Sequence, residues 1–187
     1  YGRKEDFEKL QHMGIDISGK IVIARYGGNF RGYKAKFAEA AGAAGLIIYT
    51  DPIDSGYFKG LAYPEGPYYS ESTIQRGSLL TEDFTGDPLT PYEPALPLDG
   101  MIKIKRKKPE DAQLHSIPVT PIGYCAAKEM LGQMNGDVVP EGWQGGLPFT
   151  YRLQGGSDLK VFLEVNQPRE FVRVQNVIGT VKGSLYP

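Results

Sequence analysis

The first third of the chain alternates between two kinds of apolar pattern. Residues 20–26 (KIVIARY) and 45–51 (GLIIYTD) contain continuous apolar runs rich in β-branched side chains, which are typical of buried strands. Between them, residues 33–44 repeat apolar positions at helical spacing, with Phe37 and Ala41 four residues apart. A strand, a helix and a second strand of these lengths predict a βαβ unit and an α/β fold.

Two further helices are predicted outside this unit. Residues 5–13 place Phe7, Leu10 and Met13 on one helical face, and a glycine follows at position 14. A short extended stretch precedes the second helical pattern, which covers residues 124–133 and ends near Gly136.

The middle and the end of the chain carry weaker patterns. Residues 52–97 are rich in aromatic residues, Gly and Pro, and we expect an ordered, meandering excursion there. Residues 101–108 alternate apolar and basic side chains up to Pro109, which predicts an edge strand protected by lysines. Residues 159–182 alternate with period two around a turn that contains Pro, which predicts two antiparallel strands.

Composition narrows the class of protein. The chain has 187 residues and a formal net charge of −1, so bulk attraction to nucleic acid or to an anionic membrane is not expected. It has no apolar run of about 18 residues. It begins with Tyr rather than Met, so we expect a single domain, residues 1–187, that has been excised from a larger protein.

The stretch YGGNFRG, between the first predicted strand and the helix, invites a phosphate-binding interpretation. Its glycines, at positions 27, 28 and 32, do not match the dinucleotide fingerprint, so a tight strand-to-helix turn is favoured. Arg31 in this turn leaves two interpretations open. It is either a bidentate clamp for a carboxylate or phosphate, or an exposed or ion-paired arginine.

Other reactive residues give no complete catalytic constellation. His12 and His115 lack a second His or a Cys at zinc-ligand spacing. Cys125 lies in the predicted helix 124–133, where we expect a buried, inert thiol. The basic stretch 102–108 has no interleaved aromatic residue, so a solvated strand face is favoured over nucleic-acid binding. Residues 85–94 (TGDPLTPYEP) form either a plain Pro-rich turn or a rigid loop that presents carbonyls to a hard cation.

Several stretches together resemble the protease-associated domain of the glutamate carboxypeptidase II family and, less closely, the apical domain of the transferrin receptor. They are YGRKEDFEKLQ, the βαβ stretch 19–52, YPEG, QRGSLL, GDPLTP, SIPVTPIGY and NVIGTVKG, in the order of the family. The resemblance implies a mixed β-sheet barrel or sandwich flanked by helices. It also implies a parent zinc carboxypeptidase or dipeptidase whose two zinc ions are bound in a separate catalytic domain, so this chain alone holds no catalytic residue and no cofactor.

The resemblance also implies roles for particular residues. Arg31 matches the arginine of the FRG turn that pairs with the substrate's terminal carboxylate, and Ser78 stands where the family's QRGN motif has an asparagine. Because serine is shorter and lacks an amide donor, strict glutamate specificity is not implied. Thr90 and Glu93 match a loop whose main-chain oxygens bind a structural calcium ion.

The implied partners are the catalytic domain of the same chain, a peptide substrate and a second copy of the parent, with no nucleic acid. The implied location is extracytoplasmic. The alternative is a non-catalytic interaction module, as in the receptor branch, in which the aromatic loop 57–69 forms the partner surface. A free-standing nucleotide-binding domain is a third hypothesis, and it requires nucleotide affinity that the glycine spacing does not favour.

Overall fold

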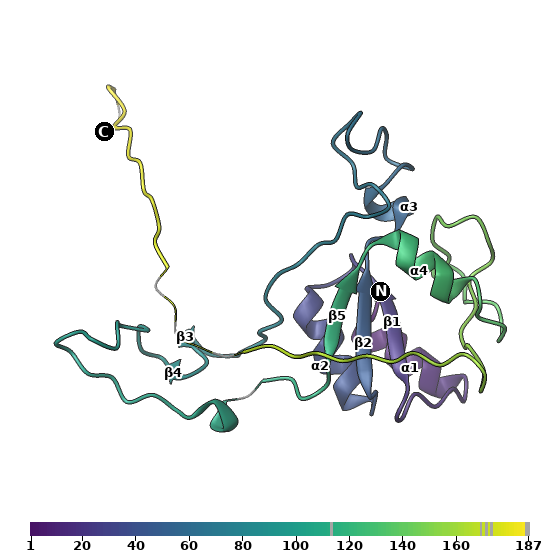
Figure 1. Cartoon of the computed structure of the whole chain (residues 1–187), viewed down its shortest axis with the longest axis horizontal. Coiled ribbons are helices and arrows are strands. Elements are labelled where there is room, and N and C mark those ends of the chain that lie inside the picture. The colour runs from purple at the N-terminus through teal and green to yellow at the C-terminus, as the bar shows by residue number, and fades with distance from the viewer. Residues whose placement is uncertain (113, 169, 171, 173, 186–187) are drawn as a thin grey trace.

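The centre of the molecule is an open parallel sheet. The structure is a computed structural model that describes residues 1–112, 114–168, 170, 172 and 174–185. The sheet has three strands in the order β1–β2–β5: β1 is Ile21–Arg25, β2 is Gly45–Tyr49 and β5 is Val119–Ile122 (Figure 1). All five residues of the central strand β2 are buried, because both of its faces are covered.

Helices cover both faces of this sheet. α1 (Lys4–His12) and α2 (Arg31–Ala40) pack on one face, and α4 (Tyr124–Leu131) packs on the other (Figure 1). Each face of the sheet has its own hydrophobic cluster, because successive side chains of a strand point to opposite faces. Leu46 packs in the cluster on the α2 side, and Tyr49 packs in the cluster on the α4 side. The α2-side cluster has Ala24, Ala35, Leu46 and Ile48 as its buried members. The α4-side cluster has Tyr49, Tyr124, Ala127, Leu131, Leu147 and Tyr151.

The predicted βαβ unit is confirmed. β1 and β2 pair in parallel, with Ile23 opposite Ile47, and α2 connects them. The helix begins two residues before the predicted range 33–44 and ends four residues before its end. It ends at Ala40 because the chain turns there, and the Ala43 amide donates to the Ala38 carbonyl at 3.0 Å.

The excursion between β2 and β5 carries only short elements. They are α3 (Pro52–Ser55), the antiparallel pair β3 (Gly86–Asp87) and β4 (Thr90–Pro91), and the 3₁₀ helix Pro109–Asp111. Figure 1 shows one loop rising beside α3 and a long arm that carries β3 and β4 away from the sheet.

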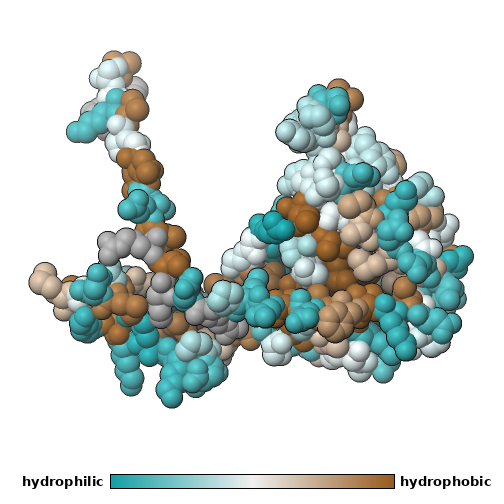
Figure 2. All heavy atoms as spheres, in the orientation of Figure 1, coloured by the Kyte–Doolittle hydropathy of each residue, from teal (hydrophilic) through white to brown (hydrophobic). Residues whose placement is uncertain are grey.

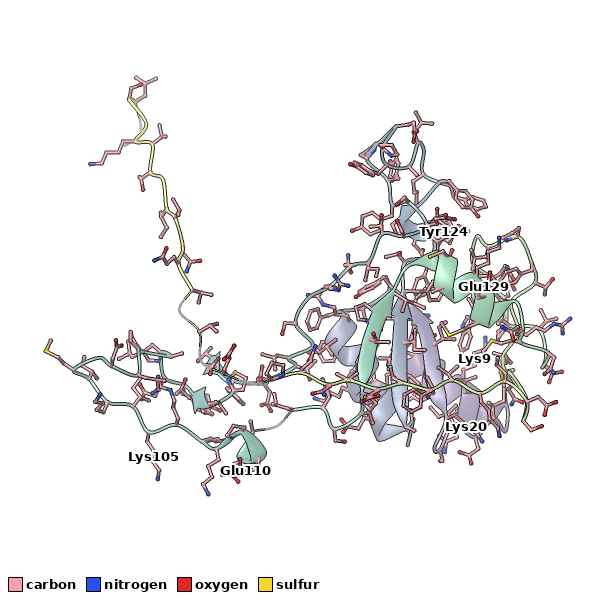
Figure 3. The ribbon with its side chains drawn as sticks, viewed as in Figure 1. Lys9, Lys20, Lys105, Glu110, Tyr124 and Glu129 are labelled. Atoms are coloured by element: carbon pink, nitrogen blue, oxygen red, sulfur yellow. The ribbon has the colours of Figure 1, made fainter. Side chains whose placement is uncertain are left out.

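The edge strand predicted for residues 101–108 is wrong. No strand is assigned there, because a single main-chain bond, from the Lys107 amide to the Leu89 carbonyl at 2.8 Å, does not make a ladder. Its lysines are solvated as expected, and the side chain of Lys105 projects outward from the arm (Figure 3).

The two late strands predicted for residues 159–182 are also wrong. None of the described residues in this range is assigned to a strand, and Val177 is 99% exposed. The segment crosses in front of the sheet and then runs away from it (Figure 1), with apolar and polar spheres alternating along it (Figure 2). A strand needs a neighbour that accepts and donates main-chain hydrogen bonds, and no described residue takes that position along the exposed part.

The expected barrel or sandwich is therefore not what the described residues form. The parallel sheet β1–β2–β5 and the pair β3–β4 are separate and open. The α/β class and the flanking helices are confirmed.

Candidate functional site

Arg31 lies at a cavity on the α2 side of the sheet. It is the first residue of α2, so the β1–α2 turn places it where the helix begins. The cavity has a volume of about 560 Å³. Its walls come from four parts of the chain: the β1–α2 region, β2, the segment before β3, and β5, with the crossing segment 164–167 alongside. The lining residues are Tyr26, Arg31, Ile48, Arg76, Gly77, Leu79, Val119, Thr120, Pro121, Glu164, Val165, Asn166 and Gln167.

A buried lysine fixes the turn that leads to Arg31. Gly27 and Gly28 have φ values of 99° and 77°, which confirms the tight turn predicted for YGGNFRG. The Lys34 ammonium is fully buried and donates to the Gly27 carbonyl and to Asn29 Oδ1, both at 2.7 Å, and to the Tyr1 carbonyl. Burial lowers the pKa of Lys34 to about 8. Lys34 was not predicted as a buried residue from the sequence. Its position beside the small residues Ala35 and Ala38 of α2 is the feature that could have indicated its burial.

Segment 76–79, which forms one wall of the cavity, packs directly against the start of α2. A Cβ atom added at Gly77 would stand 1.8 Å from Nη2 of Arg31, and one added at Gly32 would stand 2.3 Å from the Leu79 carbonyl oxygen. Any side chain at either position would therefore push segment 76–79 away from the helix. The two glycines allow the segment to approach closely enough to form the cavity wall.

The guanidinium of Arg31 has unused donor capacity. Its Nε is buried and has no hydrogen-bond partner among the described residues. Its Cζ atom lies over the Phe30 ring, 5.1 Å from the ring centre, a distance that suits a cation–π contact. Burial raises the pKa of Tyr26, and the positive charge of Arg31 opposes that rise. A guanidinium that lines a cavity favours an anionic ligand, and a carboxylate matches its planar geometry.

Ser78 is adjacent to the cavity rather than among the residues that line it. Its neighbour Gly77 contacts Arg31, but Ser78 itself is exposed. Its Oγ accepts a hydrogen bond from the Leu80 amide at 3.1 Å. Arg76, on the other side of Gly77, does line the cavity and was not predicted as a site residue.

Thr90, the first residue of β4, and Glu93, two residues after that strand, both lie near Gly86 of β3. Their carbonyl oxygens would lie 2.7 and 3.0 Å from a single Cβ position built on Gly86, so both point toward the same place. The Thr90 carbonyl also accepts from the Glu93 amide at 3.0 Å. Calcium takes six to eight oxygen ligands, so these two carbonyls fit such an ion only as part of a larger ligand set.

Other candidate residues are dispersed. Among the described residues, no group of three or more His, Cys, Asp or Glu side chains is arranged to hold a metal, so the side chains of this part of the chain do not fit a zinc site.

Cys125 is exposed, which contradicts the expected burial. The buried face of α4 is formed by Tyr124, Ala127 and Leu131, and Cys125 is not on it. No helix in the described ranges is both long and apolar enough to cross a bilayer.

Comparisons with known proteins agree with the resemblance seen in the sequence. Residues 1–79 match the family profile of the PA domain. Glutamate carboxypeptidase 2 homolog of Caenorhabditis briggsae is 37% identical over 193 residues, which cover 100% of this chain and 25% of that protein. Aminopeptidase NAALADL1 of Rattus norvegicus is 36% identical over 100% of this chain and 26% of its own length. Transferrin receptor protein 2 of Mus musculus is 31% identical over 100% of this chain and 22% of its own length.

The chain thus spans about a quarter of the length of the curated relatives it matches. Its similarity extends beyond the PA profile to the whole of the chain, including the excursion and the last segment. Residues 1–79 thus match the PA domain, and the chain as a whole is similar to glutamate carboxypeptidase-like proteins and to transferrin receptor 2.

Proposed function

We propose that this chain forms part of the substrate pocket of a zinc-dependent, glutamate carboxypeptidase-like exopeptidase. In this role Arg31 binds the C-terminal carboxylate of a peptide. The observation that carries the proposal is that Arg31 lines a cavity, in a chain similar to a glutamate carboxypeptidase 2 homolog. Bond cleavage would take place in a separate domain, where the implied zinc ions would activate water, and this chain alone would not hydrolyse peptides.

The physical argument rests on desolvation. A carboxylate enclosed in a cavity loses its hydration, so it needs charge-assisted donors to offset that cost. The fork of Arg31 offers two parallel donors, which fix both the position and the orientation of the ligand. A clamp at the peptide terminus also sets the position of the scissile bond relative to the catalytic centre.

Neighbouring residues take secondary roles in the proposal. Ser78 assists at the carboxylate end of the pocket, where a short loop movement would be needed to bring its exposed hydroxyl to the cavity. The carbonyls of Thr90 and Glu93 contribute to a structural calcium site that is completed by residues outside this chain.

The test is steady-state kinetics of the complete protein on acidic dipeptides. We expect Arg31→Ala to reduce kcat/KM by an amount equivalent to about 2–4 kcal/mol, mainly through a higher KM. Arg31→Lys restores little, because lysine lacks the fork. Lys36→Ala, an exposed cation on the same helix, is the matched control and should leave the kinetics unchanged. Equal kinetics for Arg31→Ala and the natural protein would reject the clamp.

A second function, a protein-interaction module, is favoured by one surface. The aromatic loop 57–69 exposes Phe58, Leu61 and Tyr63, with Leu61 68% and Tyr63 71% exposed. Exposed apolar groups of this kind mark contact sites for other proteins. A parent that lacks zinc ligands, together with a partner whose binding is lost on Tyr63→Ser and Leu61→Ser, would support this function over the peptidase role.

The same family relation motivates the remaining proposals about the parent. We infer that it is a homodimer and that it acts outside the cytoplasm. Sedimentation of the complete protein and localisation of a tagged copy would test these two proposals separately.

A further inference from the structure

His115 lies between two oxygen acceptors, one on Leu79 of the Arg31 cavity wall and one on Glu39 of α2. Its Nε2 is 2.9 Å from the Leu79 carbonyl oxygen, and its Nδ1 is 3.4 Å from Oε2 of Glu39. The side chain is only 14% exposed. Carbonyl and carboxylate oxygens can only accept, so the imidazole ring is the donor in either contact.

The two acceptors sit on the elements that shape the cavity. Glu39 is on α2, the helix whose first residue is Arg31, and Leu79 follows Gly77, which packs on the Arg31 guanidinium. Gly32 and Glu39 are seven residues apart, so they lie on one face of α2. The Leu79 carbonyl approaches Gly32 at one end of that face, and His115 reaches Glu39 toward the other.

The same cluster reaches the third wall. Glu39 Oε1 accepts from the Ser116 amide at 2.8 Å and from the Ser116 hydroxyl. Ser116 leads into β5, which lines the cavity through Val119 and the two residues after it. Although burial raises it, the pKa of Glu39 is lowered overall by the hydrogen bonds from Ser116 and by the bond and charge of His115.

We propose that His115 is a positioning residue for the Arg31 cavity. It holds segment 76–79 against α2 and ties both to the start of β5, so that the guanidinium keeps a fixed place in the wall. The role in substrate binding rests on the carboxylate clamp proposed above. The holding role is a property of this chain by itself.

An isolated surface ion pair contributes little to stability and would not position anything. His115 differs from such a pair in two respects. Its ring is mostly enclosed, and one of its two bonds goes to a main-chain carbonyl of the cavity wall rather than to a flexible side chain. A bond to the main chain restricts the segment itself, and segment 76–79 has no strand or helix to restrict it otherwise.

The first measurement is amide hydrogen exchange of the complete protein without substrate. We expect His115→Ala to speed exchange across residues 76–81 severalfold, with β2 unchanged. His115→Gln keeps one donor for Leu79 and should give an intermediate rate. His12→Ala removes the other histidine of the chain, which is exposed on α1, and should change nothing in this segment. Unchanged exchange at residues 76–81 in His115→Ala would overturn the proposal.

The second measurement is kinetics on an acidic dipeptide. We expect His115→Ala to raise KM about three- to tenfold with kcat within about twofold, because binding geometry changes and the chemical step does not. In an Arg31→Ala background the same substitution should add no further increase in KM. A fall in kcat with KM unchanged would overturn the positioning role. If Arg31→Ala leaves KM unchanged, the clamp is rejected, and the exchange experiment alone then decides whether His115 holds the wall.

Discussion

The apolar patterns of the β1–α2–β2 unit and of the segment 159–182 both predict strands, but only the first region forms them. In the first, Leu46 and Ile48 are 0% and 1% exposed, and their strand is paired on both sides. In the second, Val177 and Ile178 are 99% and 84% exposed, and the described residues there form no strand. An apolar pattern indicates which side chains can be buried, but a strand forms only where a neighbouring segment offers main-chain hydrogen-bond partners.

The excursion between β2 and β5 is attached to the sheet less extensively than the β1–α2–β2 unit but more than the exposed end of segment 159–182. It joins the sheet through single polar bonds and through the packing of Leu79 and Ile117 against the α2-side cluster. Thr50 Oγ1 donates to the Thr73 carbonyl at 3.2 Å, and Tyr26 donates to the Gln75 carbonyl at 2.7 Å. Such bonds each contribute about 0.5–1.5 kcal/mol, so the excursion is held by several small terms.

The largest expected loss of stability is in β2, the strand that is paired on both sides. Leu46→Ala in β2 should reduce the free energy of unfolding by about 3 kcal/mol, because it leaves a cavity between α2 and the sheet. The matched change Val177→Ala should stay within about 0.5 kcal/mol in the isolated chain, because that side chain is already in solvent. Urea denaturation followed by circular dichroism measures both. A similar loss for the two variants would mean that residue 177 is buried in solution.

A smaller effect is expected where a polar network joins β2 to the α4 side. The Asp51 carboxylate is fully buried and accepts from Tyr49 at 3.0 Å, from Tyr151 at 2.5 Å and from the Gly146 amide at 2.8 Å. Tyr151→Phe removes one donor to Asp51 and leaves the Leu147 amide without its acceptor. We expect a loss of about 1–3 kcal/mol in the free energy of unfolding.

The control for this variant is Tyr63→Phe, since Tyr63 is 71% exposed. That substitution should change the free energy of unfolding by less than about 0.5 kcal/mol. Thermal unfolding of both variants gives the comparison, and an unaffected Tyr151→Phe protein would show that water replaces the lost hydroxyl.

The smallest effect concerns the polar tie between α2 and the segment before β5. The pKa of Glu39 is lowered from its usual 4.5, so its folded state favours the charged form. Its contribution is therefore complete above pH 4.5 and is lost as the pH falls through the lowered value. Glu39→Gln should reduce stability by about 0.5 kcal/mol at neutral pH and by less in acid.

Glu8→Gln is the control for the acid effect. Glu8 lies 3.6 Å from the Lys4 ammonium in an exposed pair on α1, where screening by water leaves little to lose. Stability curves between pH 3 and 7 should converge in acid for Glu39→Gln and the natural chain. Parallel curves would show that Glu39 does not titrate differently on folding.

Sequence reasoning predicted the elements that depend on local pattern. The βαβ unit, α1 and α4 are present, with helix ends shifted by a few residues. The turn at Gly27 and Gly28 was predicted from the glycines that lie between the predicted strand and helix. These succeed because neighbouring residues determine the backbone conformation there, and because a continuous apolar run has to be buried.

The cavity was predicted only in part. Arg31 and the QRGSLL stretch were identified from the family resemblance, but Lys34, Gly77 as the contact of Arg31, and the tie through His115 were not. Glu39 and His115 are 76 positions apart, so no local spacing connects them. The burial of Lys34 likewise depends on which carbonyls surround its ammonium.

By itself, then, the sequence determined the α/β class, the βαβ unit and the arginine at the start of a helix. Only the tertiary structure decided that the sheet stays open, that Cys125 faces solvent and that segment 76–79 lies on Arg31. The physical reason is range: side-chain period and backbone propensity act over a few residues, whereas a cavity wall depends on contacts between residues far apart in the chain.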